Sequence, residues 1–168
     1  MAKITLKAEP LTRESFKAYG DVIEIDNASH FSINAGNVER FHDLAKVSID
    51  SEAGGRPQIS IMQTNTATKL PARVAVVERH PKGSQAFYPL FDSPLVIVVA
   101  KATDDFKVED LKAFVTNGQQ GYNFQPGTWH MPLITPKVGQ QMFIVDRGGP
   151  GDNCDELRLE NEEIYVNV

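Results

Sequence analysis

Residues 78–87 read Glu-Arg-His-Pro-Lys-Gly-Ser-Gln-Ala-Phe, and this stretch decides the fold. It follows the apolar run Val74–Val77, so it predicts two short strands joined by a Pro-Lys-Gly turn. Side chains alternate between the two faces of an extended strand, so Glu78 and His80 point the same way. The turn would fold Gln85 back across from this pair. A carboxylate, an imidazole and an amide are therefore expected on one wall.

A second turn, Gln125–His130, contains Pro-Gly and delivers another histidine about forty-five residues further along the chain. If neighbouring hairpins bring both turns into the mouth of a small barrel, His80 and His130 would lie close to Glu78. Imidazole and carboxylate groups bind divalent metals, and an imidazole titrates near neutrality. The predicted catalytic residues are Glu78, His80 and His130, and the predicted metal ligands are these three together with Gln85.

The rest of the chain predicts an all-β fold, because short runs rich in β-branched and aromatic residues alternate with turn residues every 8–12 positions. A short N-terminal helix is expected after Thr12, with Thr12 as its N-cap. The tail after Asp155 is expected to add a closing strand or a short helix. The expected strands are Val22–Ile25, Phe31–Asn34, Glu39–His42, Val47–Ile49, Ile59–Met62, Val74–Val77, Ala86–Tyr88, Val96–Val99, Ala113–Val115, Gly121–Phe124, Trp129–Met131 and Met142–Val145.

Length and composition exclude several classes of protein. The 168 residues suit one domain spanning 1–168, and a net charge of -5 argues against nucleic acid as a partner. The single cysteine, Cys154, suits a reducing compartment. The N-terminus lacks the apolar core of a signal peptide, and the longest apolar run, Leu95–Ala100, is too short to span a membrane. We therefore expect a cytoplasmic protein with no membrane partner.

Other residues could bind an anionic substrate. Arg40 and His42 fall on the same face of a predicted strand and could present a cationic fork to a carboxylate, with Asn34 and Arg147 as further candidates. Each has a structural alternative. Arg40 and His42 could be an exposed pair neutralised by adjacent acids, and Arg147 could form a structural ion pair. Likewise, a single histidine on a strand is more often a hydrogen-bonded structural residue than a ligand.

The two histidine motifs resemble degenerate versions of the two motifs of cupins, whose sites lie in the mouth of a jelly-roll barrel, a double-stranded β-helix. A longer series of motifs between Leu11 and Asp155 resembles the ureidoglycolate lyase family. These motifs are Tyr19–Ile23, Glu39–Ala45, Glu78–Pro81, Gly83–Phe87, Asn117–Gly118, Gln120–Gly121, Trp129–His130, Asp146–Gly148 and Asn153–Asp155.

The resemblance implies a cupin-fold homodimer that cleaves (S)-ureidoglycolate into glyoxylate and urea late in allantoin (purine) degradation. It also implies a divalent metal, with nickel as the metal of some members. His80 and His130 would share the proton transfers, and Glu78 would orient His80 or bind the ion. Arg40 and His42, with Asn34 and Arg147, would hold the substrate carboxylate, and Gln85 is a further expected substrate-binding residue.

Two positions depart from the family pattern, because Gln125 and Met131 stand where histidines are expected. They leave two alternatives open. One is another cupin enzyme acting on a small acid, such as an isomerase or an oxygenase. The other is a cupin that binds glyoxylate or a hydroxy acid without lyase activity. Formation of urea and glyoxylate without oxygen would separate the lyase from both.

Overall fold

The computed structural model describes residues 3–168, and its main body is built from two sheets that face each other. One sheet has six strands in the order β15-β8-β13-β10-β11-β2. Their bounds are β15 (Asp155–Arg158), β8 (Val76–Arg79), β13 (Trp129–His130), β10 (Val96–Ala100), β11 (Lys112–Val115) and β2 (Glu9–Pro10). The predicted all-β fold is confirmed. No helix among the described residues is long and apolar enough to cross a membrane.

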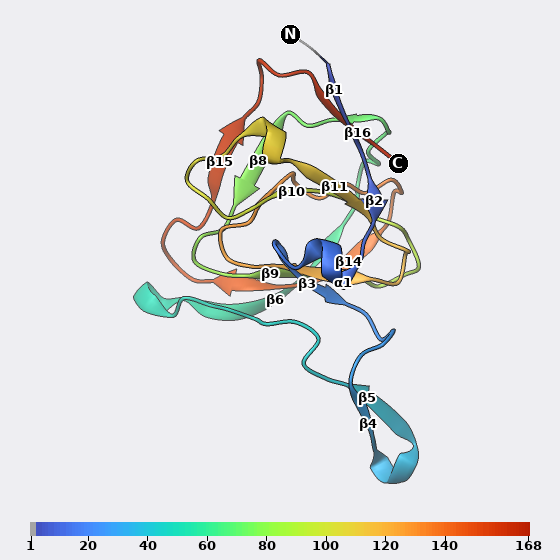
Figure 1. Cartoon of the computed structure of the whole chain (residues 1–168). Helices are drawn as coiled ribbons and strands as arrows, with labels where there is room; N and C mark the ends of the chain where they lie inside the picture. Colours follow the sequence, from blue (N-terminus) through green and yellow to red (C-terminus); the bar gives the residue numbers. More distant parts are fainter. Residues whose placement is uncertain (1–2) are drawn as a thin grey trace.

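The second sheet has five strands in the order β3-β12-β9-β14-β6. These are β3 (Gly20–Ile23), β12 (Gly121–Phe124), β9 (Gln85–Pro89), β14 (Gln141–Gly148) and β6 (Arg56–Gln63). A third, three-stranded sheet in the order β1-β16-β7 lies beside the six-stranded sheet, where the first and last strands run in parallel near both chain ends (Figure 1). It consists of β1 (Ile4–Lys7), β16 (Ile164–Asn167) and β7 (Ala72–Arg73).

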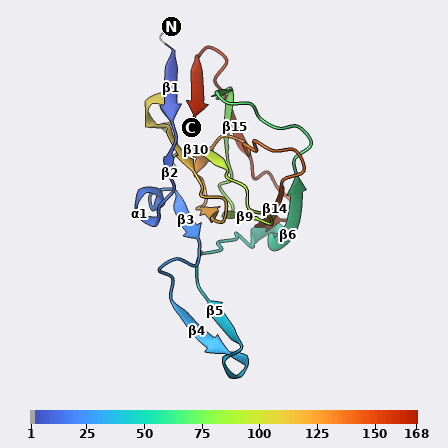
Figure 2. The same ribbon diagram turned by 90° about the vertical axis from the view of Figure 1, so that its right-hand side faces the viewer.

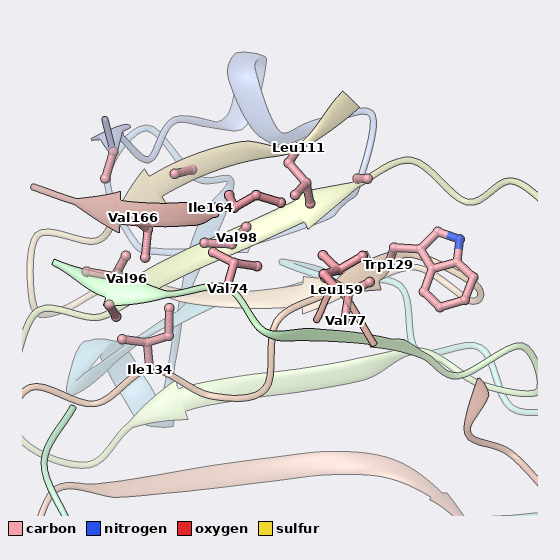
Figure 3. Packing of buried hydrophobic residues seen from close by; sticks show 14 residues of the cluster. Val74, Val77, Val96, Val98, Leu111, Trp129, Ile134, Leu159, Ile164 and Val166 are labelled. Atoms are coloured by element: carbon pink, nitrogen blue, oxygen red, sulfur yellow. The ribbon is translucent and has the colours of Figure 1, made fainter. Parts of the chain in front are cut away.

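Strand β10 lies at the centre of the packing and has no solvent-exposed face, because all five of its residues are buried. Ile97 and Val99 pack between the two large sheets against aromatic side chains that include Tyr122 and Phe124. Val96, Val98 and Ala100 pack on the opposite side. There they join a second core with residues of the three-stranded sheet, including Ile164 and Val166 (Figure 3). The six-stranded sheet is thus a layer between two hydrophobic cores.

Helix α1 (Arg13–Phe16) is the predicted N-terminal helix, and it is a single turn. Thr12 caps it as predicted, because its side-chain oxygen accepts the backbone N–H of Ser15. Phe16 is fully buried and its ring packs against Tyr19 and Phe114. The helix therefore closes one end of the space between the sheets. Three short 3-10 turns complete the secondary structure, η1 (Asn34–Gly36), η2 (Glu52–Gly54) and η3 (Val108–Asp110).

The structure corrects two local predictions. Val47–Ile49 does not form a strand, since only Ile49 makes an isolated bridge, to Gly83. The Pro-Lys-Gly turn does not close a hairpin either. Strands β8 and β9 belong to different sheets, so this turn crosses from one sheet to the other. Because of this crossing, Gln85 faces Glu78 from the opposite sheet rather than from the neighbouring strand.

The hairpin of β4 (His30–Ile33) and β5 (Val38–Phe41) projects away from the body (Figures 1 and 2). We call residues 30–42 the arm. The two strands pair only with each other, and the 3-10 turn η1 forms the tip. Both strands were predicted, but their separation from the body was not.

Candidate functional site

Two sheet-crossing turns meet at one end of the barrel. The first connects β8 to β9, and the second connects β12 to β13. The backbone N–H of Gly127, in the second turn, donates a 2.9 Å hydrogen bond to the carbonyl oxygen of His80, in the first. Gly127 has a φ of 81°, in the left-handed region that favours glycine. The two motifs identified in the sequence are therefore fastened to each other.

The structure brings His80 and His130 together around Glu78. Glu78 and His130 are direct partners on the neighbouring strands β8 and β13. One carboxylate oxygen of Glu78 (Oε1) lies 3.4 Å from Nε2 of His130 and 3.7 Å from Nε2 of His80. The centroids of the two imidazole rings are 5.2 Å apart. Two nitrogens and a carboxylate thus converge on one small volume.

Each imidazole is oriented through its other nitrogen. Nδ1 of His80 lies 2.7 Å from the carbonyl oxygen of Asn153, and Nδ1 of His130 lies 3.0 Å from that of Thr128. A carbonyl oxygen only accepts hydrogen bonds, so in the neutral ring the proton resides on Nδ1 and the lone pair on Nε2. The ring of His130 also stacks on Phe124, with 4.3 Å between centroids. Both Nε2 atoms are buried and have no hydrogen-bond partner.

The surroundings of this cluster shift the pKa of Glu78 and the pKa of His80. Interaction with His130, and then with His80, holds the pKa of Glu78 well below its usual range, although burial acts in the opposite direction. For His80, burial favours the neutral ring, but interactions with Glu78 and the Asn153 carbonyl outweigh it and raise the pKa. Glu78 is therefore ionised at neutral pH, and His80 holds a proton more readily than a free histidine.

Gln85 faces this cluster from the five-stranded sheet, oriented by a carboxylate that sequence reasoning missed. Its amide nitrogen donates to Asp146 at 3.3 Å, and Asp146 also accepts from the amide of Gln58 at 2.9 Å. The oxygen of Gln85 is buried without a hydrogen-bond partner. Strand alternation could have indicated Asp146, because Ile144, two residues earlier, is in the core between the sheets.

The cluster borders a pocket of about 320 Å³ between the two large sheets. Its wall is mainly apolar, with Glu78, Gln85 and His130 as its polar members, and none of the described residues that line it is a lysine or an arginine. The lining residues are Met62, Glu78, Gln85, Phe87, Val96, Ile97, Tyr122, Phe124, His130, Met131, Pro132 and Leu133. The pocket suits a small polar molecule held at one end.

The same atoms fit a divalent metal ion. One ligand atom each from Glu78, His80 and His130 can be chosen so that all lie within 4.8 Å of one another. Both imidazoles present a lone pair through Nε2, and their Nδ1 atoms are fixed by carbonyl oxygens, as is usual for metal-binding histidines. The unpartnered oxygen of Gln85 supplies a further donor, so the donor set is compatible with such an ion.

The structure does not bring the predicted carboxylate-binding residues to this pocket within one chain. Asn34, Arg40 and His42 lie on the arm, which projects away from the body (Figure 2). Arg147 is buried and its guanidinium donates to the carbonyl oxygens of Asp50, Glu52 and Pro150. It lies next to Asp146 on β14 and so points to the opposite face of the sheet.

The two departures from the family pattern occupy different surroundings. Gln125 donates its amide to the carbonyl of Ala18 and lies outside the pocket, whereas Met131 lines it. Of the two, only Met131 therefore contributes to the pocket wall, as an apolar side chain at a position where the resemblance leads us to expect an imidazole.

A jelly-roll barrel with two imidazoles and a carboxylate at the mouth of an internal pocket defines the cupin class. The family model described as ureidoglycolate lyase matches residues 3–167. The chain belongs to the ureidoglycolate lyase family. It is 48% identical over 155 residues to a ureidoglycolate lyase of Burkholderia mallei (strain NCTC 10229), covering 92% of this chain and 89% of the relative.

Two further similarities accompany this match. A ureidoglycolate lyase of Pseudomonas fluorescens (strain SBW25) is 46% identical over 162 residues, or 96% of each chain. Among solved structures, a 3,4-ketoisomerase from Helicobacter canadensis aligns with a TM-score of 0.47 and 14% identity, covering 85% of this chain and 94% of that one.

Proposed function

We propose that this protein cleaves (S)-ureidoglycolate into glyoxylate and urea. Membership of the ureidoglycolate lyase family supports this activity. The structural observation that carries the proposal is the pair of buried, unpartnered Nε2 atoms of His80 and His130, which face the ionised Glu78 beside a small pocket. Such an arrangement supplies proton transfer to a substrate that needs no redox chemistry.

The substrate is a carbinolamide, with a hydroxyl and a ureido nitrogen on the same carbon. In the cleavage the hydroxyl loses its proton and becomes the aldehyde oxygen, the carbon–nitrogen bond breaks, and the departing nitrogen gains a proton and leaves as urea. The net change moves one proton from oxygen to nitrogen. A base and an acid within hydrogen-bond reach of these two atoms can therefore accelerate both halves of the reaction.

His80 and His130 are assigned to these proton transfers. In the neutral ring each Nε2 can accept the hydroxyl proton, and in the protonated ring it can donate to the nitrogen. Glu78 stabilises whichever ring is protonated, since its oxygen lies within 3.7 Å of both. Gln85, oriented by Asp146, directs a carbonyl oxygen to the pocket and can accept a hydrogen bond from the ureido N–H groups.

A divalent ion is included in the proposal, with nickel as the metal. Glu78, His80 and His130 would hold it, with Gln85 as a fourth donor. When bound, such an ion acidifies a coordinated hydroxyl and orients the substrate. With the ion bound, His80 and His130 would act as ligands, so the proton transfers assigned to them above apply to the protein without the ion.

The remaining elements of the proposal concern the setting of the enzyme. It acts as a cytoplasmic homodimer in the degradation of allantoin, a purine catabolite, on a free small molecule. The net charge of -5 and the single cysteine suit this setting.

The decisive experiment identifies the products. Purified protein is incubated with racemic ureidoglycolate, with and without a chelator, and urea, ammonia and glyoxylate are quantified together with the residual enantiomer. Urea and glyoxylate in equal amounts, without ammonia and without oxygen uptake, are expected. Ammonia in place of urea would indicate a hydrolase. Thermal stabilisation by glyoxylate without any turnover would indicate a protein that only binds the acid.

A further inference from the structure

The arm has two chemically different faces. The register Phe31↔Arg40 and Ile33↔Val38 places these four side chains on one face. The ring of Phe31 also packs against that of His42, with 5.1 Å between the ring centroids. The opposite face is mainly polar, with Glu39 bonded to His30 and Ser32, and Phe41 is its apolar member. The arm therefore has an apolar face that also carries the guanidinium of Arg40 and the imidazole of His42.

Nothing in its own chain is packed on this apolar face. Phe31 is 45% exposed and Val38 is 43% exposed. An isolated two-stranded hairpin is at best marginally stable in water. A hairpin of defined shape with an uncovered apolar face is therefore expected to be held by another surface.

The five-stranded sheet has a matching uncovered face. Side chains of β14 alternate, so Met142 and Ile144 are buried inside while Phe143 and Val145 point outward. Phe143 pairs with Ile61 and Tyr88, and Val145 pairs with Ile59.

On β6, Ile59 is 70% exposed and Ile61 is 60% exposed. We call these outward residues the outer patch, which comprises Ile59, Ile61, Tyr88, Phe143 and Val145. A contiguous exposed apolar group of this kind marks an interaction site.

The outer patch and the pocket lie on opposite faces of the five-stranded sheet, and both extend to its edge strand β6. Met62 follows Ile61 on the edge strand β6, is 40% exposed, and also lines the pocket. The pocket thus reaches the surface at the strand that carries the patch. It contains no lysine or arginine among its described lining residues, although the substrate proposed above is a carboxylate. Arg40 forms no ion pair with any residue in the range 3–168.

We propose that two copies of this chain exchange arms. The apolar face of each arm covers the outer patch of the other copy, and Arg40 of each copy reaches the mouth of the partner's pocket to bind the substrate carboxylate. A twofold arrangement uses the same two surfaces twice and leaves neither exposed. We choose a second copy as the partner because one surface meets both needs. The apolar face of the arm has to be covered, and the same face carries Arg40, a cation of the kind that the pocket lacks. The role of Arg40 rests on the proposed function; the exchange of arms does not.

Oligomeric state tests the exchange without any reference to activity. Sedimentation analysis of the full chain is expected to show a dimer. The variants Phe31→Ser/Val38→Ser and Ile59→Ser/Ile61→Ser are each expected to weaken the dimer at least a hundredfold. A third variant, with residues 30–41 replaced by a short Gly-Ser linker, removes the arm without altering the barrel. Glu39→Gln, on the polar face, is the matched control and is expected to remain dimeric. Circular dichroism and thermal melting confirm that each variant is folded.

A monomeric wild-type chain, or a dimer that persists without the arm, would overturn the exchange. So would an arm-face or outer-patch variant that is folded and still fully dimeric.

Complementation tests the role of Arg40. Arg40→Ala and His130→Ala are prepared separately, and each is expected to lose most of its activity. When the two chains are co-refolded at random, half of the dimers contain one chain of each kind. One of the two sites in such a dimer has both His130 and the partner's Arg40, so about one quarter of wild-type activity is expected. No gain above the two separate variants would overturn the role of Arg40 in the partner's site. If wild type itself releases no urea, the proposed function fails, and sedimentation still decides the exchange.

Discussion

Glu78 and His130 lie directly opposite each other on adjacent strands, with Oε1 of Glu78 3.4 Å from Nε2 of His130. Strand pairing holds the two backbones side by side, so both side chains project from neighbouring positions of the same sheet. His80, two residues after Glu78, shares the same oxygen. The site is therefore a cluster in which neighbouring groups lower the pKa of Glu78 and raise the pKa of His80.

Glu78→Gln is expected to change how stability depends on pH. The raised pKa of His80 means that its interaction with Glu78 stabilises the fold fully below the ordinary pKa of 6.5, and this contribution is lost as pH rises through the folded-state value. The lowered pKa of Glu78 means that its contribution is present above the ordinary value of 4.5 and is lost as pH falls towards the folded-state value. The stability difference between wild type and variant should therefore be largest between these two pH values.

Urea unfolding of chelator-treated protein at a series of pH values measures this difference. Glu156→Gln is the matched control. Glu156 lies on β15 directly opposite Glu78 of β8, but it is exposed. A difference that does not vary with pH would contradict the electrostatic link between Glu78 and the imidazoles.

His130→Ala is expected to lower kcat about 10²–10⁴-fold, the usual effect of losing a positioned acid or base. The fold should survive, because the ring packs mainly on Phe124 and lies beside the pocket. Release of urea gives the rate, and thermal melting reports stability. His30→Ala serves as control, since His30 lies on the polar face of the arm. Near-normal turnover in His130→Ala would remove this residue from the mechanism.

Asp146→Asn is expected to lower kcat/KM roughly 10–100-fold, as is common for residues that orient a ligand or catalytic group. Asp146 accepts amide N–H groups from both Gln58 and Gln85. Asparagine has only one accepting oxygen, so Gln85 is free to turn its nitrogen towards the pocket. Asp92→Asn is the control, because Asp92 accepts an amide N–H from Gln119 at the surface. Unchanged kinetics would show that the orientation of Gln85 is unimportant.

Arg147→Ala is expected to lower the free energy of unfolding by about 3 kcal/mol or more while leaving KM almost unchanged. Its guanidinium satisfies three backbone carbonyl groups, and a buried hydrogen bond to a charged group contributes about 1.5–3 kcal/mol. Urea unfolding and steady-state kinetics separate the two effects, with the exposed Arg56→Ala as control. A tenfold rise in KM with little loss of stability would instead support a role in binding substrate.

The sequence predicted much of this architecture because the relevant signals are local. Alternation places Glu78 and His80 on one face of a strand, and the Pro-Gly turn before Trp129 delivers His130 from a separate motif. The cap at Thr12 is equally local, because it depends on residues three positions apart. The meeting of the two motifs followed from assuming a barrel, and the structure shows the hydrogen bond between Gly127 and His80 that joins them.

The parts of the architecture that the sequence did not predict depend on which sheet each strand joins. The alternation of side chains along a strand carries no information on that choice. A Pro-Lys-Gly turn fits both a hairpin and a crossing between sheets, so the position of Gln85 was predicted without its cause. Phe31 and Arg40 have the pattern of an ordinary amphipathic strand, which gives no sign that the pair stands outside the barrel. Arg147 could not be assigned because its partners are backbone carbonyl groups, which any sequence supplies.

The fold assigns the width of the pocket and its preference for a substrate to different parts of the chain. The packing of the two sheets sets the width, and residues near the two turns that cross between the sheets set the preference. The width of the chamber is fixed by the spacing of the two sheets, with β10 wedged between both cores, and it cannot change without repacking the interior. The groups proposed to take part in the reaction lie next to these turns, since Glu78 and His130 are near the ends of β8 and β13 and His80 directly follows β8. A barrel of this kind can thus be adapted to a longer or differently charged acid by replacing a lining residue such as Met131, while the packing of the two sheets stays as it is.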